Sequence, residues 1–108
     1  MPYTFEHLDD EQALAASFEL MRGLRPHVVD PDRYVAQLVR QTAQGYRVLA
    51  AKEGGRLLGL AGYRELENLL YGRFIYFDDL VVSPELQRSG VGAQLLSAVR
   101  EQAQQLRP

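Results

Sequence analysis

Two adjacent carboxylates, Asp78 and Asp79, lie within the most strand-like stretch of this 108-residue chain, RFIYFDDLVV from Arg73 to Val82. A carboxylate can remove a proton from a reacting group, directly or through water, so the pair is a candidate for general-base chemistry. Because side chains alternate along a strand, we expect the two acids to point to opposite faces of a sheet. Only one can then easily face a cleft, and the other is expected to be structural, bonded to backbone or to an arginine.

A second candidate site is the glycine-containing segment QRSGVG, Gln87 to Gly92, which follows that stretch. A loop that leads from a strand into a helix presents free backbone N–H groups and the positive end of the helix dipole, which favours phosphate. The Walker motif would need Gly-Lys-Ser/Thr, but Ala93-Gln94 follows the second glycine. The dinucleotide fingerprint would need a third glycine where Leu95 stands. The remaining pattern is Gln-x-x-Gly-x-Gly, and the alternative is a capped turn that binds no ligand.

Capping residues and helical spacing predict two helices in the first half of the chain, after a short strand over residues 3–8. Asp9, with Gln12 three residues later, is typical of a capping box and predicts a first helix that continues to about Leu24. Asp30-Pro31 predicts the start of the second helix, because proline is tolerated in the first helical position. Gly45 predicts its end.

The hydrophobic period then changes to that of strands. We expect strands over residues 46–53 and 56–64, joined by Gly54-Gly55 in a tight turn, then a connection over 65–72 and a strand over 73–82. From Gly90, a third helix is marked by apolar residues at helical spacing: Val91, Leu95, Ala98, Val99 and Leu106. The predicted order is therefore β-α-α-β-β-β-α.

The overall composition excludes several classes of function. The net charge of −2 gives no electrostatic basis for binding nucleic acid or an anionic membrane. The chain has no cysteine, so it has no disulfide framework and no thiolate nucleophile, and we expect a cytoplasmic protein. The two histidines, His7 and His27, lack metal-ligand spacing, so we assign no metal.

The stretch DDLVVSPELQRSGVGAQLL resembles the acetyl-CoA-binding motif of the GNAT (GCN5-related) N-acetyltransferases, in which a strand, a Gln/Arg-x-x-Gly-x-Gly/Ala loop and a helix follow one another. The predicted order of elements is also similar to the first seven elements of that fold, so the resemblance covers essentially all of residues 1–108 as a single domain. It implies an α/β (α+β) fold of three layers with a mainly antiparallel sheet. It further implies transfer of an acetyl group from acetyl-CoA to a primary amine of a small molecule or peptide by direct attack.

The resemblance also implies roles for particular residues. The backbone of Leu80, Val81 and Val82 would pair with the pantetheine arm, and an N–H near Val81 would polarise the thioester carbonyl. Asp78 would be the general base and Asp79 a structural acid, and the alternative is that both acids are structural. The acceptor amine would be recognised around residues 21–29 and 65–71. Backbone N–H groups of the loop would cradle the coenzyme A pyrophosphate, from Gln87, Arg88, Ser89, Gly90, Val91 and Gly92.

The family fold continues with a further strand and helix beyond the last element predicted here. We therefore expect this chain to be the N-terminal portion of an acetyltransferase, with weak or absent acetyl-CoA binding on its own. The free edge of residues 73–82 is expected to seek a second copy, giving a homodimer or a swapped assembly. Two alternatives stay open: a non-catalytic module that binds acyl-CoA, and a structural fragment that dimerises through that edge.

Overall fold

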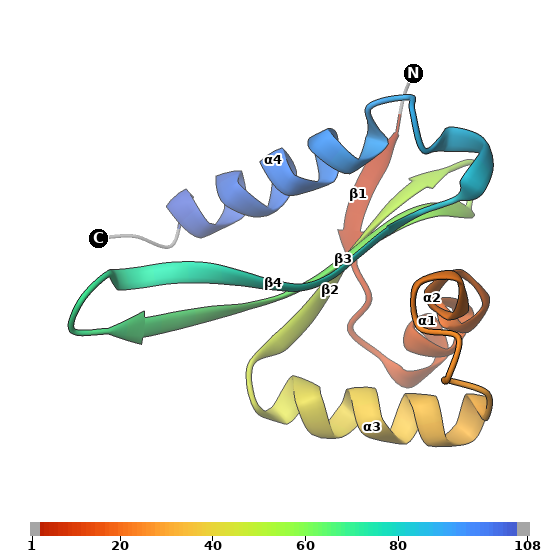
Figure 1. The fold of residues 1–108 in the computed structure, drawn as a ribbon, viewed down its shortest axis with the longest axis horizontal. Helices are drawn as coiled ribbons and strands as arrows, with labels where there is room; N and C mark the ends of the chain where they lie inside the picture. The colour runs from red at the N-terminus through yellow and green to blue at the C-terminus, as the bar shows by residue number, and fades with distance from the viewer. Residues whose placement is uncertain (1–2, 106–108) are drawn as a thin grey trace.

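The computed structural model describes residues 3–105, which form an antiparallel sheet with helices on both faces (Figure 1). The predicted order of elements is confirmed, except that the first helix is divided in two. The elements are β1 (Thr4–His7), α1 (Glu11–Ala16), α2 (Phe18–Leu24), α3 (Pro31–Ala43), β2 (Tyr46–Glu53), β3 (Arg56–Asn68), β4 (Gly72–Val82), the short 3₁₀ helix η1 (Pro84–Leu86) and α4 (Val91–Gln105).

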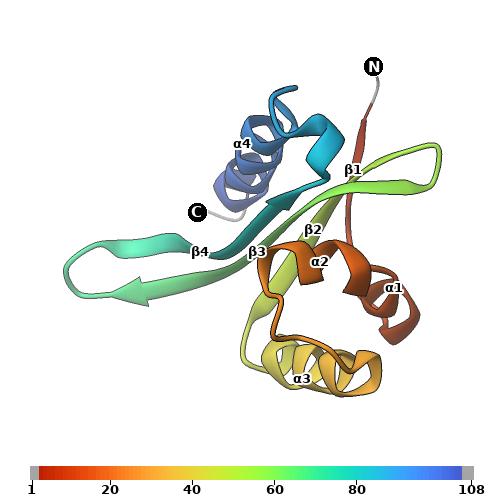
Figure 2. The same cartoon turned by 45° about the vertical axis from the view of Figure 1, so that its right-hand side comes forward.

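The three predicted layers are present. The strands lie in the order β1-β2-β3-β4, all antiparallel, with α1, α2 and α3 on one face and α4 on the other (Figure 2). Each face has its own apolar core. Leu14, Phe18 and Leu38 belong to the core under α1–α3, and Val91, Leu95 and Val99 belong to the core under α4. The predicted Leu106 lies outside the described residues.

Capping residues set the helix starts, with one correction to the prediction. Asp10, not Asp9, caps α1, because its carboxylate accepts a hydrogen bond from the N–H of Ala13 at 2.7 Å. Asp9 instead forms an ion pair with Arg47 at 3.4 Å. Asp30 caps α3 as predicted, accepting from the N–H groups that follow Pro31.

The prediction of a single first helix is wrong, because the helix is interrupted at Ser17. The Ser17 hydroxyl is fully buried, donates to the carbonyl oxygen of Leu14 at 2.6 Å and lies 2.6 Å from the hydroxyl of Tyr34 on α3. A serine that bonds the preceding turn competes with regular helix geometry. The break therefore depends on a partner from a distant segment.

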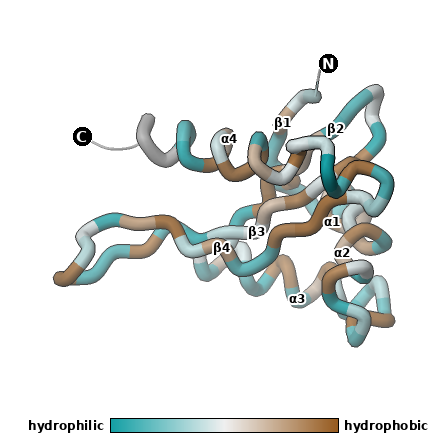
Figure 3. The backbone as a smooth tube through the Cα atoms, turned by 45° about the horizontal axis from the view of Figure 1, so that its top comes forward, coloured by the Kyte–Doolittle hydropathy of each residue, from teal (hydrophilic) through white to brown (hydrophobic). Residues whose placement is uncertain are grey.

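The predicted connection over residues 65–72 is also wrong, because β3 continues to Asn68 and pairs with the start of β4. The resulting hairpin projects beyond the rest of the molecule and ends in an apolar tip (Figures 1 and 3). At this tip, Leu69, Leu70 and Tyr71 are exposed, and the Asn68 side chain accepts from the N–H of Tyr71 at 2.7 Å.

The turn between β2 and β3 is the Gly-Gly turn that the sequence predicts. Gly54 and Gly55 have φ values of +59° and +81°, which a type I′ turn requires and which other residues adopt only with strain. No helix within residues 3–105 has the length and apolar character needed to cross a lipid bilayer.

Candidate functional site

An irregularity in the β3–β4 pairing places Asp78 and Asp79 on the same face of the sheet. Gly62 pairs with Asp79 and Tyr63 with Phe77, so Asp78 is the extra residue of a β-bulge. The Asp79 carboxylate bonds Tyr46, and the Asp78 carboxylate bonds Arg64, which is the cross-strand partner of Tyr46. The prediction that the two acids face opposite sides is therefore wrong, since strict alternation does not hold across a bulge.

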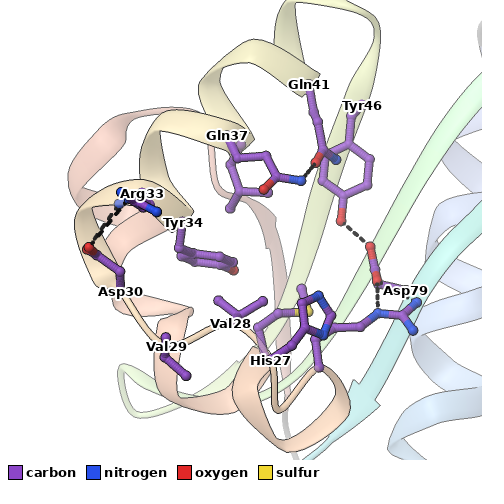
Figure 4. Close-up of a pocket in the computed structure, with 13 residues that line it drawn as sticks. His27, Val28, Val29, Asp30, Arg33, Tyr34, Gln37, Gln41, Tyr46 and Asp79 are labelled. Carbon is purple, nitrogen blue, oxygen red and sulfur yellow. Dashed lines mark hydrogen bonds and ion pairs between the residues drawn. The ribbon is translucent and has the colours of Figure 1, made fainter.

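Asp79 is the centre of a network that joins three elements (Figure 4). Its carboxylate accepts from the Tyr46 hydroxyl at 2.7 Å and from the Arg25 Nε at 3.0 Å. Arg25, which follows α2, also donates to the backbone carbonyl of Asp78 at 3.0 Å. Asp79 thus bonds an arginine, as the sequence predicts, but Asp78 does so too, and the structural role of Asp79 stays a prediction. Arg25 links the end of α2 to the bulge.

The position of Tyr46 depends on the absence of a side chain at Gly62. A Cβ built on Gly62 would lie 1.9 Å from the Tyr46 hydroxyl oxygen, far inside any allowed contact. Burial, followed by the hydrogen bond to the Asp79 carboxylate, raises the pKa of Tyr46 well above its ordinary range. The phenol therefore stays protonated and donates to Asp79.

Asp78 has a separate partner. Both of its carboxylate oxygens accept from Arg64, at 2.9 and 3.0 Å, in the bidentate geometry that suits arginine. This hydrogen bond raises the pKa of Arg64, so the guanidinium remains charged. The guanidinium also lies over the ring of Tyr76, 5.1 Å from its centroid.

A groove runs between the end of α2, the last residues of β4 and the glycine loop, and we refer to it as the loop groove. Six of the nine residues predicted to bind the cofactor line it, since Leu80, Val81 and Val82 face the loop residues Gln87, Gly90 and Gly92. Its lining residues are Gly23, Leu24, Leu80, Val81, Val82, Gln87, Gly90, Gly92 and Ala93.

The backbone of β4 is open along this groove, because β4 is the edge strand of the described sheet. The N–H of Ser83 donates to the carbonyl of Leu58 at 2.8 Å, and hydrogen-bonded pairs alternate along an antiparallel ladder. The amide of Val81 therefore points toward β3, whereas the amides of Leu80 and Val82 point toward the open edge. These two are the N–H groups near Val81 that a ligand along the edge can reach.

The loop itself has the geometry of an anion site. Gly90 has a φ of +91° and precedes α4, whose first N–H groups, from Val91, Gly92 and Ala93, have no acceptor within the helix. The Val91 side chain is fully buried in the core, so only its backbone is available. Ser89 is held inside the loop, because its N–H and hydroxyl both donate to the Leu86 carbonyl. The amide of Ser89 is therefore already used within the loop. The backbone amides better placed to bind an anion are those of Gln87, Gly90, Val91 and Gly92.

A second cavity, the helix cavity, has a volume of about 410 Å³ and lies between α2, α3 and the sheet (Figure 4). Its lining residues are Met21, Arg25, His27, Val28, Val29, Asp30, Arg33, Tyr34, Gln37, Leu38, Gln41, Tyr46 and Asp79. Of the region 21–29, which the sequence predicts to recognise the acceptor, five residues line this cavity: Met21, Arg25, His27, Val28 and Val29. The hairpin residues 65–71 do not, because they belong to the projecting arm.

The two cavities meet at the bulge. At two places, residues adjacent in sequence line different cavities. Leu24 and Leu80 line the loop groove, whereas their neighbours Arg25 and Asp79 line the helix cavity. Four further lining residues were not predicted as site residues from the sequence: Tyr34, Gln37 and Gln41 on α3, and Tyr46 on β2. Both tyrosines are buried, but each also presents part of its surface to the helix cavity.

The family model described as the Acetyltransferase (GNAT) family matches residues 9–107. No curated protein sequence matches the chain.

Solved structures with this fold include a GNAT family acetyltransferase from Staphylococcus aureus, at 18% identity and a TM-score of 0.83, covering 98% of this chain and 81% of that one. Another is a ribosomal-protein-alanine N-acetyltransferase from Brucella melitensis biovar Abortus, at 17% identity and a TM-score of 0.81, covering 97% and 74%. The aminoglycoside N-acetyltransferase AAC(6')-Iy in complex with CoA is 18% identical, with a TM-score of 0.78, covering 96% and 70%. These similarities establish the fold, and the match over residues 9–107 shows that the chain belongs to the GNAT acetyltransferase family.

Proposed function

We propose that this chain is an N-acetyltransferase domain that transfers an acetyl group from acetyl-CoA to a primary amine by direct attack. The observation that carries the proposal is the loop groove. It brings the open backbone edge of β4 beside the glycine loop at the start of α4. An extended arm can pair with the edge while a pyrophosphate accepts from the loop amides. The absence of cysteine is consistent with the cytoplasm as the proposed location.

The acetyl thioester is placed where the groove meets the bulge. The outward N–H groups of Leu80 and Val82 lie on either side of Val81, and one of them can donate to the thioester carbonyl oxygen. Such a donor stabilises the charge that develops on this oxygen as the amine attacks. The amine then approaches from the helix cavity, which adjoins the groove at Asp79 and Leu80.

Asp78 is the proposed general base, and Asp79 is the alternative that the cavity geometry favours. The two carboxylates lie side by side on one face, but only Asp79 lines the helix cavity. Each already accepts hydrogen bonds from an arginine, Asp78 from Arg64 and Asp79 from Arg25. The amine proton can pass to either acid directly or through water.

A matched pair of variants tests the assignment. We expect Asp78→Asn to lower kcat by about 10²-fold or more at unchanged acetyl-CoA affinity, as the loss of a general base does. Asp79→Asn should reduce activity less if Asp79 only holds Arg25 and Tyr46 in place. Thiol release during turnover measures kcat, and calorimetry measures the affinity. The reverse order of the two losses would transfer the role of base to Asp79.

The non-catalytic alternative rests on the same groove, since a protein can bind acyl-CoA without turning it over. Calorimetric binding of acetyl-CoA with no thiol release across a broad panel of amines would favour it. Absence of both binding and turnover would contradict both readings. It would favour a structural chain that self-associates through β4, the edge strand of the described sheet.

A further inference from the structure

The floor of the helix cavity is apolar, whereas its α3 side also carries the amides of Gln37 and Gln41, which are hydrogen-bonded to each other at 2.9 Å. Met21, Leu38 and Tyr34 line the floor and are exposed by only 3%, 5% and 6% respectively, and all three belong to the core under α1–α3. Val28 and Val29 of the α2–α3 loop add apolar surface at its side. A ligand that enters the cavity therefore places its body against hydrocarbon and aromatic surface, from which it displaces water favourably.

The charged groups at the edge of the cavity compensate one another. Asp30 caps α3 and lies 3.9 Å from the guanidinium of Arg33. Asp79 accepts from Arg25 and from Tyr46. Among the described residues that line the cavity, two carboxylates thus face two guanidinium groups. A ligand with several ammonium groups would have to compete for each carboxylate with a cation that is already in place.

One end of the cavity differs from the rest. Asp79 lies there, its side chain only 15% exposed, and the neighbouring Leu80 already belongs to the loop groove. A single amine at this end would lie beside the acetyl group, with the rest of its molecule over the apolar floor.

We infer that the acceptor is a monoamine whose remaining part is an alkyl or aryl group, rather than a polyamine or an aminoglycoside. This inference rests on the proposed function and specifies the substrate class of the same site. The volume of about 410 Å³ lies within the range of roughly 300–1,000 Å³ typical of small-molecule sites. The amine would lie at Asp79, and the apolar group would lie against Met21, Val28 and Tyr34.

Direct binding of four amines to the 108-residue chain tests this inference without requiring turnover. The probes are 2-phenylethylamine and isoamylamine as apolar monoamines, and spermidine and sisomicin as polycations. We expect calorimetry to give each monoamine an affinity at least about ten-fold higher than either polycation, a difference of about 1.4 kcal/mol. Tighter binding of spermidine or sisomicin, or no millimolar binding of either monoamine, would overturn the inference.

A charge variant and its control separate cavity chemistry from general effects. Val29 lines the cavity and is 70% exposed, so Val29→Asp should fold normally and add an uncompensated carboxylate. We expect it to weaken binding of 2-phenylethylamine and strengthen binding of spermidine. Val39→Asp makes the same change on an exposed residue outside the cavity lining and should alter neither affinity. Equal responses of the two variants would contradict the inference.

The proposed function and the proposed substrate class can be tested separately. If acetyl-CoA does not bind, the proposed function fails, whatever the amines do. If acetyl-CoA binds and polycations are the preferred acceptors, only the inference about substrate class is wrong.

Discussion

At the scale of single residues, the site depends on a contact that a glycine makes possible. The Tyr46 hydroxyl lies where a side chain at residue 62 would be, and from there it donates to Asp79. Asp79 in turn accepts from Arg25, which holds the carbonyl of Asp78. The conformation of the bulge therefore depends on Gly62. The direction of the β4 amides that follow the bulge depends on it too.

Replacing Gly62 by alanine should destabilise the protein by about 3 kcal/mol, because the new Cβ displaces Tyr46 and leaves Asp79 without one of its donors. Chemical denaturation monitored by circular dichroism measures the free energy of unfolding. Gly23→Ala is the matched control, since a Cβ there meets no atom within 4 Å and alanine favours the helix. A Gly62→Ala protein as stable as the unaltered chain would contradict the role given to this contact.

A histidine on β1 makes the stability depend on pH. The His7 Nε2 lies 2.7 Å from the Tyr63 hydroxyl, and burial, aided by Arg47, lowers the pKa of His7 below its ordinary value. The unfolded chain therefore binds a proton at a higher pH than the folded protein does. The stability present above about pH 6.5 should fall as the pH drops toward the folded pKa of His7.

Melting temperatures between pH 7.5 and 5.0 test this dependence. The unaltered protein should lose more stability over this range than His7→Gln, which keeps a polar side chain at this position but cannot titrate. Identical slopes for the unaltered protein and His7→Gln would show that another group is responsible.

Individual site residues were predictable where a local motif identifies them. Gln87, Gly90 and Gly92 follow from the loop pattern, and they line the loop groove together with Leu80. The shared face of Asp78 and Asp79 was not predictable, because nothing in the local sequence marks the bulge. It depends on how Gly62 and Tyr63 pair across the sheet.

Among the elements, the turn from β4 into α4 is the one whose conformation should affect acetyl-CoA binding most. Gly90→Ala should cost about 1–2 kcal/mol of stability, since its φ of +91° strains any residue with a Cβ. We also expect it to weaken acetyl-CoA binding about ten-fold, measured by calorimetry, as the loop amides shift.

Gly54→Ala is the matched control for that prediction. Gly54 also has a positive φ, of +59°, but it lies in the β2–β3 turn and outside the loop groove. This variant should lose stability and keep its affinity for acetyl-CoA. Equal losses of affinity in the two variants would indicate a general effect of strain rather than a role for the glycine loop.

Elements were predictable where the pattern is local and strong. The strand β2, the Gly-Gly turn and the capped start of α3 match their predictions for this reason. The break at Ser17 was missed because its partner, Tyr34, comes from another helix. The length of β3 was missed because residues 65–68 form a projecting arm, where polar side chains face solvent and no apolar alternation appears.

At the scale of the whole molecule, β4 is the edge of the described sheet, and Tyr76 and Leu80 on it are exposed. Such an edge is a template for pairing with another strand, so we predict that the chain without acetyl-CoA self-associates into a homodimer or a swapped assembly. Sedimentation velocity over a concentration series should show a dimer. Leu70→Ser alters the apolar tip of the hairpin instead of the edge and should leave the dimer intact. A clean monomer at high concentration would contradict the prediction.

Nuclear magnetic resonance of the ¹⁵N-labelled chain can show residue by residue whether the loop groove binds acyl-CoA through backbone amides, as we claim. Titration with acetyl-CoA should shift the amide signals of Leu80, Val82, Gly90 and Gly92, which surround the groove. The amides of Gly54 and Gly55, in the β2–β3 turn, should not move. Unchanged spectra at millimolar acetyl-CoA, or shifts confined to residues outside the groove, would contradict the claim.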